Sequence, residues 1–189
     1  MTVAELHAMK RDGRKIAAVV CWDSNTAGVA DEAGADIISV GDSAAASLEE
    51  LLAFCASARR GVKRALLSCD LPDANVKDAR RLVEAGADLV KVEGVDNVRA
   101  IAAAGIPVFA QIESAHEAEA MEEAGAVLID FRHSGPEAGA DAAAAVSIPV
   151  LGGLGGGPWL DGRVRASHRL LDVDGYVDDV RAGRSVRGD

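Results

Sequence analysis

Short runs of aliphatic residues alternate along the chain with longer stretches in which small apolar residues recur every three or four positions. Such runs are typical of buried parallel strands, and the longer stretches are typical of amphipathic helices. Strands are expected near 16–22, 36–41, 64–69, 88–92, 106–111, 126–131, 148–152 and 162–166. Helices are expected near 3–11, 25–33, 47–59, 76–85, 97–103, 115–124, 136–144 and 175–182.

A repeated tetrapeptide marks the ends of three expected helices. Glu-Ala-Gly-Ala occurs at 32–35, 84–87 and 123–126, each time between a helical stretch and a β-branched run. The glycine suits the position after a helix, where φ is positive and a side chain would clash. The repeat therefore makes a helix followed by a strand the building unit, and this unit favours a parallel sheet.

Helix starts agree with this division. Thr2-x-x-Glu5, Ser47-x-x-Glu50 and Ser114-x-x-Glu117 match the capping box, in which a hydroxyl and a carboxylate satisfy the first free amides.

Eight strands that alternate with helices predict a single (β/α)8 barrel of the TIM type over residues 1–183, with a frayed tail at 184–189. Since such barrels usually need about 250 residues, the loops must be short. An open doubly wound sheet is the alternative.

Composition narrows the range of partners. The 189 residues carry a net charge of −10, which argues against a nucleic-acid partner. No apolar run reaches the roughly 18–20 residues of a membrane span, and the N-terminus lacks a signal-peptide pattern. The three cysteines have no CxxC spacing, so we expect reduced thiols in a cytoplasmic protein.

Four expected strands end on an acid. These acids are Asp42, Asp70, Glu93 and Asp130. Because the carboxyl ends of parallel strands lie on one side of the fold, the four side chains should converge there. Carboxylates that lie so close together repel each other, so they need a bound cation, or one of them must have a raised pKa. The pattern predicts a divalent-metal site with a general base beside it.

Several stretches, in order along the chain, resemble one family. They are 15–23, 30–43, 61–72, 84–94, 148–157, 161–164 and 176–183. The family is ketopantoate hydroxymethyltransferase, the pantothenate-pathway member of the phosphoenolpyruvate/pyruvate barrel superfamily. The resemblance implies a cytoplasmic homo-oligomer that catalyses a Mg²⁺-dependent aldol-type reaction. In that reaction the metal stabilises the enolate of a small 2-oxo acid, which attacks a one-carbon unit from 5,10-methylenetetrahydrofolate.

The resemblance also implies residue roles. Asp42 and Asp70 match the metal ligands of the family, and Glu93 would hold a metal-bound water. Ser43 and Lys91 would bind the carboxylate and keto group of the substrate, so that Lys91 also takes part in catalysis.

The chain departs from the family at two positions of the pocket. Asp130 stands where the family has its basic Glu, and we expect Asp130 to remove the substrate proton. Gln111 stands where the family has a His; it can hydrogen-bond to substrate but cannot titrate near neutrality. Three family insertions are also reduced, at 44–47, 73–75 and 113–114. The donor is therefore methylenetetrahydrofolate or another aldehyde equivalent.

Other interpretations stay open. A lyase of the same superfamily would use the same enolate chemistry, and a non-catalytic scaffold would keep the barrel without turnover. Structural roles also exist for the individual acids. Asp42 could cap a helix, Asp70 could form a turn, Glu93 could pair with Lys91, and Asp130 could pair with Arg132 or His133.

Overall fold

The computed structural model describes residues 1–41, 47–153, 159–167 and 172–184. Within these residues the strands are β1 (Ile16–Val20), β2 (Ile37–Val40), β3 (Leu66–Asp70), β4 (Leu89–Glu93), β5 (Val108–Ile112), β6 (Ala126–Phe131), β7 (Val150–Gly152) and β8 (Gly162–Ala166). They pair in parallel in sequence order, and β8 closes on β1. The predicted barrel is confirmed, and the open-sheet alternative is wrong.

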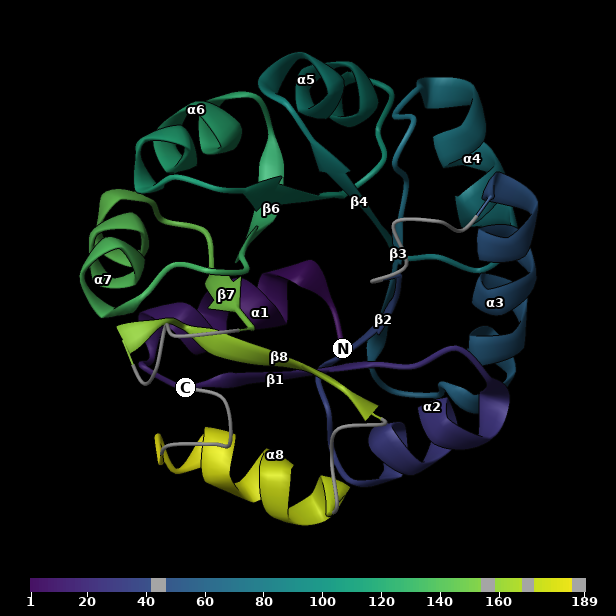
Figure 1. Ribbon diagram of the computed structural model, residues 1–189, viewed down its shortest axis with the longest axis horizontal. Helices are drawn as coiled ribbons and strands as arrows, with labels where there is room; N and C mark the ends of the chain where they lie inside the picture. The colour runs from purple at the N-terminus through teal and green to yellow at the C-terminus, as the bar shows by residue number, and fades with distance from the viewer. Residues whose placement is uncertain (42–46, 154–158, 168–171, 185–189) are drawn as a thin grey trace.

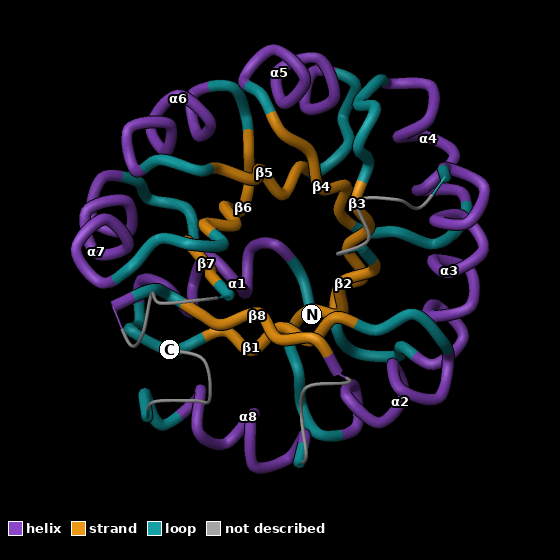
Figure 2. The backbone as a smooth tube through the Cα atoms, viewed as in Figure 1, coloured by secondary structure: helices purple, strands orange, loops and turns teal. Residues whose placement is uncertain are grey.

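Helices surround the barrel (Figures 1 and 2). The surrounding helices are α2 (Ser24–Glu32), α3 (Leu48–Gly61), α4 (Val76–Glu84), α5 (Val95–Ala103), the 3₁₀ turn η1 (Ala115–Glu117), α6 (Ala118–Glu123), α7 (Pro136–Ala145) and α8 (Val173–Arg181). A further helix, α1 (Val3–Arg11), lies across one end of the barrel. Most element bounds lie within two residues of the expected ones. The stretch expected as one helix at 115–124 divides into η1, which begins at the capping box of Ser114 and Glu117, and α6.

The predicted local signals are present. Gly34, Gly86 and Gly125 end α2, α4 and α6 with φ of 92°, 113° and 102°. The capping box at Ser47 is formed with Glu50. Local sequence therefore sets where helices stop and strands begin.

One end of the barrel is closed. Leu6 and Met9 of α1 belong to the same buried cluster as Ile16, Ile37 and Leu89, which lie near the start of their strands. Figure 1 shows α1 across the barrel behind β7 and β8. Helix α1 thus covers the amino-terminal end of the strands, and the carboxyl-terminal end is left for a ligand site.

The interior changes from apolar to polar along the strands. Ser39, Ser68, Lys91 and Asp130 are all buried, and each lies two residues beyond a buried leucine or isoleucine on its strand. Because side chains alternate along a strand, this spacing places the polar residues on the interior face, above the apolar residues. The barrel therefore carries a buried polar layer near its carboxyl-terminal end.

Candidate active site

Lys91 is the centre of the polar layer. Its ammonium lies 2.9 Å from Oδ2 of Asp130 and 3.6 Å from Oδ1 of Asp70. The ring of Phe109 lies beneath it, with 4.9 Å from Nζ to the ring centroid. These side chains come from β3, β4, β5 and β6, which pair in that order, so the parallel pairing of four strands brings them together.

The surroundings keep Lys91 charged. Burial by itself lowers the pKa of Lys91, but the carboxylates of Asp130 and Asp70 outweigh burial and raise the pKa above its usual value. Lys91 is therefore a fixed cation that orients two carboxylates, and it does not act as a proton acceptor near neutral pH.

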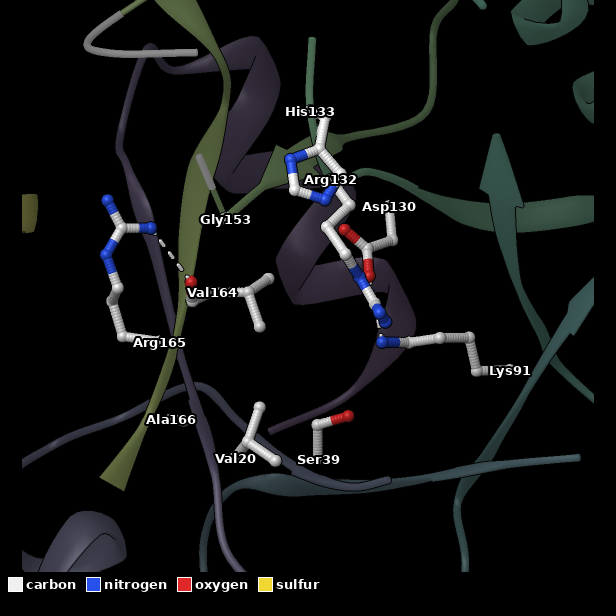
Figure 3. A pocket seen from close by; sticks show the side chains of 10 residues that line it. All are labelled: Val20, Ser39, Lys91, Asp130, Arg132, His133, Gly153, Val164, Arg165 and Ala166. Atoms are coloured by element: carbon white, nitrogen blue, oxygen red, sulfur yellow. Dashed lines mark hydrogen bonds and ion pairs between the residues drawn. The ribbon is translucent and has the colours of Figure 1, made fainter. Parts of the chain in front are cut away.

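Two buried oxygens near Lys91 have unused hydrogen-bonding capacity. Oδ1 of Asp130 and Oγ of Ser39 have no hydrogen-bond partner among the described residues. Figure 3 shows Asp130 and Ser39 on either side of the Lys91 head group. Buried polar atoms are normally paired, so both oxygens are suited to contact a ligand.

A cavity of about 220 Å³ opens at this point. Lys91, Asp130 and Ser39 line it, together with Arg132 and His133 from the end of β6. The remaining wall comes from Arg165 and from the apolar or small residues Val20, Gly153, Val164 and Ala166. The cavity can therefore hold a small ligand with an acidic group and a short carbon chain.

Gln111 lies beside the cavity and connects two strands. Its amide nitrogen donates to Oε1 of Glu93, and its amide oxygen accepts from the Arg132 guanidinium at 3.2 Å. Gln111 therefore positions Arg132 and Glu93. A substrate contact by Gln111 stays a prediction.

The predicted metal ligands are only partly covered. Asp42 and Ser43 lie outside the described residues. Among the residues that are described, no group of three or more His, Cys, Asp or Glu could hold a metal ion. Asp70 lies at the correct strand end, and its carboxylate packs against Gly41, where an added Cβ would come within 2.1 Å. That contact puts the Asp70 carboxylate beside the residue that precedes Asp42.

Two structural alternatives are wrong. Lys91 pairs with Asp70 and Asp130, whereas Glu93 accepts from Gln111, so the alternative of a Lys91–Glu93 pair is not the arrangement found. The partner found for Asp130 is Lys91, where Arg132 or His133 was the alternative. Lys91 is the register partner of Asp70 in the pairing of β3 with β4, and it shares the buried interior with Asp130.

The sequence did not predict a place in the site for Ser39 and Phe109, or the position of Arg132. The available signal for Ser39 was its place inside the apolar run of β2. A buried hydroxyl normally needs a hydrogen-bond partner, so a serine in a buried strand indicates a polar contact. No signal in the sequence singled out the contact between Arg132 and Gln111.

The cysteines do not belong to the chemistry. Cys21, Cys55 and Cys69 are buried free thiols, as expected. Burial raises the pKa of the Cys21 thiol to about 11, so it is protonated and unreactive at neutral pH.

None of the described helices is both long and apolar enough to span a bilayer.

The fold and the site define a class: an α/β-barrel enzyme with a buried lysine–carboxylate centre at the carboxyl ends of its strands. Residues 1–115 match the model of the family described as ketopantoate hydroxymethyltransferase. A curated relative, 3-methyl-2-oxobutanoate hydroxymethyltransferase of Cyanothece sp., is 34% identical over 92% of this chain and 85% of its own. The chain belongs to the ketopantoate hydroxymethyltransferase family, as predicted, and is thereby a transferase-type enzyme.

Solved structures agree on the fold. Phosphonopyruvate hydrolase in complex with oxalate and Mg²⁺ has a TM-score of 0.66 at 18% identity, covering 96% of this chain and 85% of that chain. For 2,3-dimethylmalate lyase, a member of the PEP mutase/isocitrate lyase superfamily, the TM-score is 0.68 at 15% identity, with coverages of 89% and 81%. At these identities the likeness is one of fold.

The alignment with the Cyanothece relative spans 222 positions, whereas this chain has 189 residues. The relative therefore has segments that this chain lacks. This agrees with the short loops expected after the strands.

Proposed function

We propose that this protein forms a C–C bond on a small 2-oxo acid by transferring a hydroxymethyl unit, with Asp130 as the base. The observation that carries the proposal is the state of Asp130. Its side chain is 2% exposed, Lys91 holds one oxygen at 2.9 Å, and the other oxygen has no hydrogen-bond partner among the described residues. A base held in this way keeps one oxygen available for the proton next to the substrate carbonyl.

The other residues orient the substrate. Lys91 offers its charge to the developing negative oxygen, which is worth most in a water-poor site. Ser43 would bind the substrate carboxylate, and Gln111 would hydrogen-bond at the edge of the pocket. Asp130 is one methylene shorter than the Glu expected in the family, so the substrate must lie closer to β6.

We further propose that the site binds a hard divalent cation. The Asp70 carboxylate packs against Gly41, directly before Asp42, and carboxylate oxygens are the ligands that Mg²⁺ prefers. Asp42 and Asp70 would hold the ion, with Glu93 on a bound water. Bound Mg²⁺ would supply electrophilic assistance to the substrate oxygens. The Mg²⁺ in phosphonopyruvate hydrolase supports this choice.

Proton exchange tests the proposal directly. The protein is incubated with 3-methyl-2-oxobutanoate in D₂O, with and without Mg²⁺, and loss of the C3 proton signal is followed by NMR. Exchange should require Mg²⁺ and should fall at least about 10²-fold in Asp130→Asn. Asp141→Asn changes an exposed acid on α7 in the same way and should leave the exchange rate unchanged. Exchange at the wild-type rate in Asp130→Asn would remove Asp130 from the role of base.

A lyase reaction is the second candidate, because this chain lacks segments of its longer relative and the loops around the site are short. Methylenetetrahydrofolate separates the two. Formation of a hydroxymethylated product would establish transfer. Exchange without such a product, together with cleavage of a 2-hydroxy-substituted dicarboxylate, would favour the lyase.

A further inference from the structure

Two neighbouring strands each carry a buried serine that the proposed roles do not use. Ser39 of β2 and Ser68 of β3 are register partners, and the two residues are 1% and 0% exposed. Neither Oγ has a hydrogen-bond partner among the described residues. Paired strands lie about 4.8 Å apart, and register partners point to the same face. The barrel interior therefore holds two adjacent hydroxyls with unused hydrogen-bonding capacity.

The two serines interrupt a row that is otherwise aliphatic. Val20 of β1 is the register partner of Ser39, and Leu89 of β4 is the register partner of Ser68. A buried hydroxyl without a partner lowers stability, whereas an apolar group of similar shape in its place does not. Packing of the interior therefore gives no reason for the two hydroxyls, and a contact with a bound molecule does.

The row borders the cavity of the candidate site. Ser39 and Val20 line the cavity together with Lys91 and Asp130. Figure 3 shows Ser39 beside Val20, with the Lys91 head group between Ser39 and Asp130. Ser68 continues the same face on β3. A ligand at Lys91 and Asp130 would therefore extend its carbon chain toward Val20 and the two serines.

The surroundings of the serines favour a neutral polar group on that chain. The charge of Lys91 is already matched by Asp130 at 2.9 Å and Asp70 at 3.6 Å. A second charged group of the ligand would therefore be buried beside neutral hydroxyls without a counter-charge, which is costly. A methyl group would leave both serines without a partner. A hydroxyl can donate and accept, as each serine can, so it satisfies the pair.

We infer that the substrate is a 2-oxo acid whose carbon chain carries a hydroxyl group, and that Ser39 and Ser68 bind this hydroxyl. The 2-oxo acid end lies at Lys91 and Asp130, and the hydroxyl lies at β2 and β3. The inference rests on the proposed function, because it names the class of substrate for the same site.

Two pairs of ligands test the inference, and in each pair a hydroxyl replaces a methyl group of the same size. The pairs are 3-hydroxypyruvate with 2-oxobutanoate, and 4-hydroxy-2-oxobutanoate with 2-oxopentanoate. Binding of each acid is measured by calorimetry in the presence of MgCl₂. We expect wild type to bind the hydroxylated acid at least about tenfold more tightly in one pair or both, as one satisfied buried hydrogen bond requires. Equal affinity within both pairs overturns the inference.

Serine-to-alanine variants assign the preference. Ser39→Ala and Ser68→Ala should each reduce it at least about threefold, and the double variant should abolish it while binding the methyl-bearing acids within about twofold of wild type. Ser147→Ala is the matched control, because Ser147 is exposed and precedes β7, at the other end of the strands. This control should keep the preference. A preference that survives in the double variant overturns the inference, because another group would then bind the hydroxyl.

Urea unfolding distinguishes a ligand contact from a structural one. Ser39→Ala and Ser68→Ala should keep or raise the unfolding midpoint, because each removes a buried hydroxyl that has no partner within the fold. A lowered midpoint in both variants would mean that the hydroxyls are satisfied in the free protein, as by a buried water, and would overturn the inference.

The remaining outcomes separate the two proposals. Proton exchange of 3-methyl-2-oxobutanoate without a preference for either hydroxylated acid leaves the proposed function standing and rejects the hydroxyl subsite. A preference that depends on the serines, without exchange of any 2-oxo acid, supports the subsite and rejects the proposed function. Binding of none of the four acids rejects both.

Discussion

Replacement of Lys91 by methionine should destabilise the protein strongly, although methionine fits the same space. The Lys91 side chain is 4% exposed, and its ammonium lies 2.9 Å from Asp130 and 3.6 Å from Asp70. At an effective dielectric constant of about 20, these separations correspond to gross attractions of about 6 and about 5 kcal/mol. Desolvation of the three charged groups offsets most of that attraction.

The net cost of Lys91→Met comes from the buried carboxylate that loses its partner. Lys91→Met leaves the Asp130 carboxylate buried without its cation, and such a change typically costs about 3–5 kcal/mol. Lys91→Met combined with Asp130→Leu removes both charges and should return to within about 2 kcal/mol of wild type. The double variant should therefore be more stable than Lys91→Met alone.

Urea unfolding of four proteins gives the required thermodynamic cycle: wild type, Lys91→Met, Asp130→Leu and the double variant. A cost below about 1 kcal/mol for Lys91→Met would refute the reasoning. Additive single costs would refute it equally, because they would mean that the two buried charges do not depend on each other.

Three further outcomes follow from contacts elsewhere. Asp31 accepts hydrogen bonds from the backbone N–H groups of residues 63–65. Burial raises the pKa of Asp31, but these hydrogen bonds outweigh burial and lower the pKa below its usual 3.8. The Asp31 carboxylate therefore stabilises the folded protein fully above pH 3.8, and this stabilisation is lost as the pH falls below that value. The difference in unfolding free energy between wild type and Asp31→Asn should shrink as pH falls. Tyr176→Phe removes a hydroxyl 3.0 Å from carbonyl oxygens of β1 and β8 and should cost about 1–2 kcal/mol in urea unfolding; no measurable loss would contradict the contact. In Gly41→Ala the new Cβ displaces the Asp70 carboxylate, so Mg²⁺ affinity by calorimetry should fall at least about tenfold, and unchanged affinity would remove Asp70 from the metal site.

The order and type of the elements could be predicted from sequence because their causes are local. A glycine at the end of a helix, a capping box at its start and an apolar run between them act over a few residues. Ser47 forms its box with Glu50, three residues away, and Gly86 ends α4 where the repeat placed it. Eight such units then leave the closed barrel as the favoured parallel arrangement.

The candidate site was decided by tertiary structure. Lys91 and Asp130 are 39 residues apart, and Gln111 and Arg132 are 21 apart. The sequence by itself indicated that acids would gather at the carboxyl ends of the strands. It did not determine that Asp70 and Asp130 share one buried lysine, or that Gln111 orients an arginine into the cavity. Those pairings depend on barrel register and on the interior face of each strand, since both are properties of the closed sheet and neither is encoded within one strand.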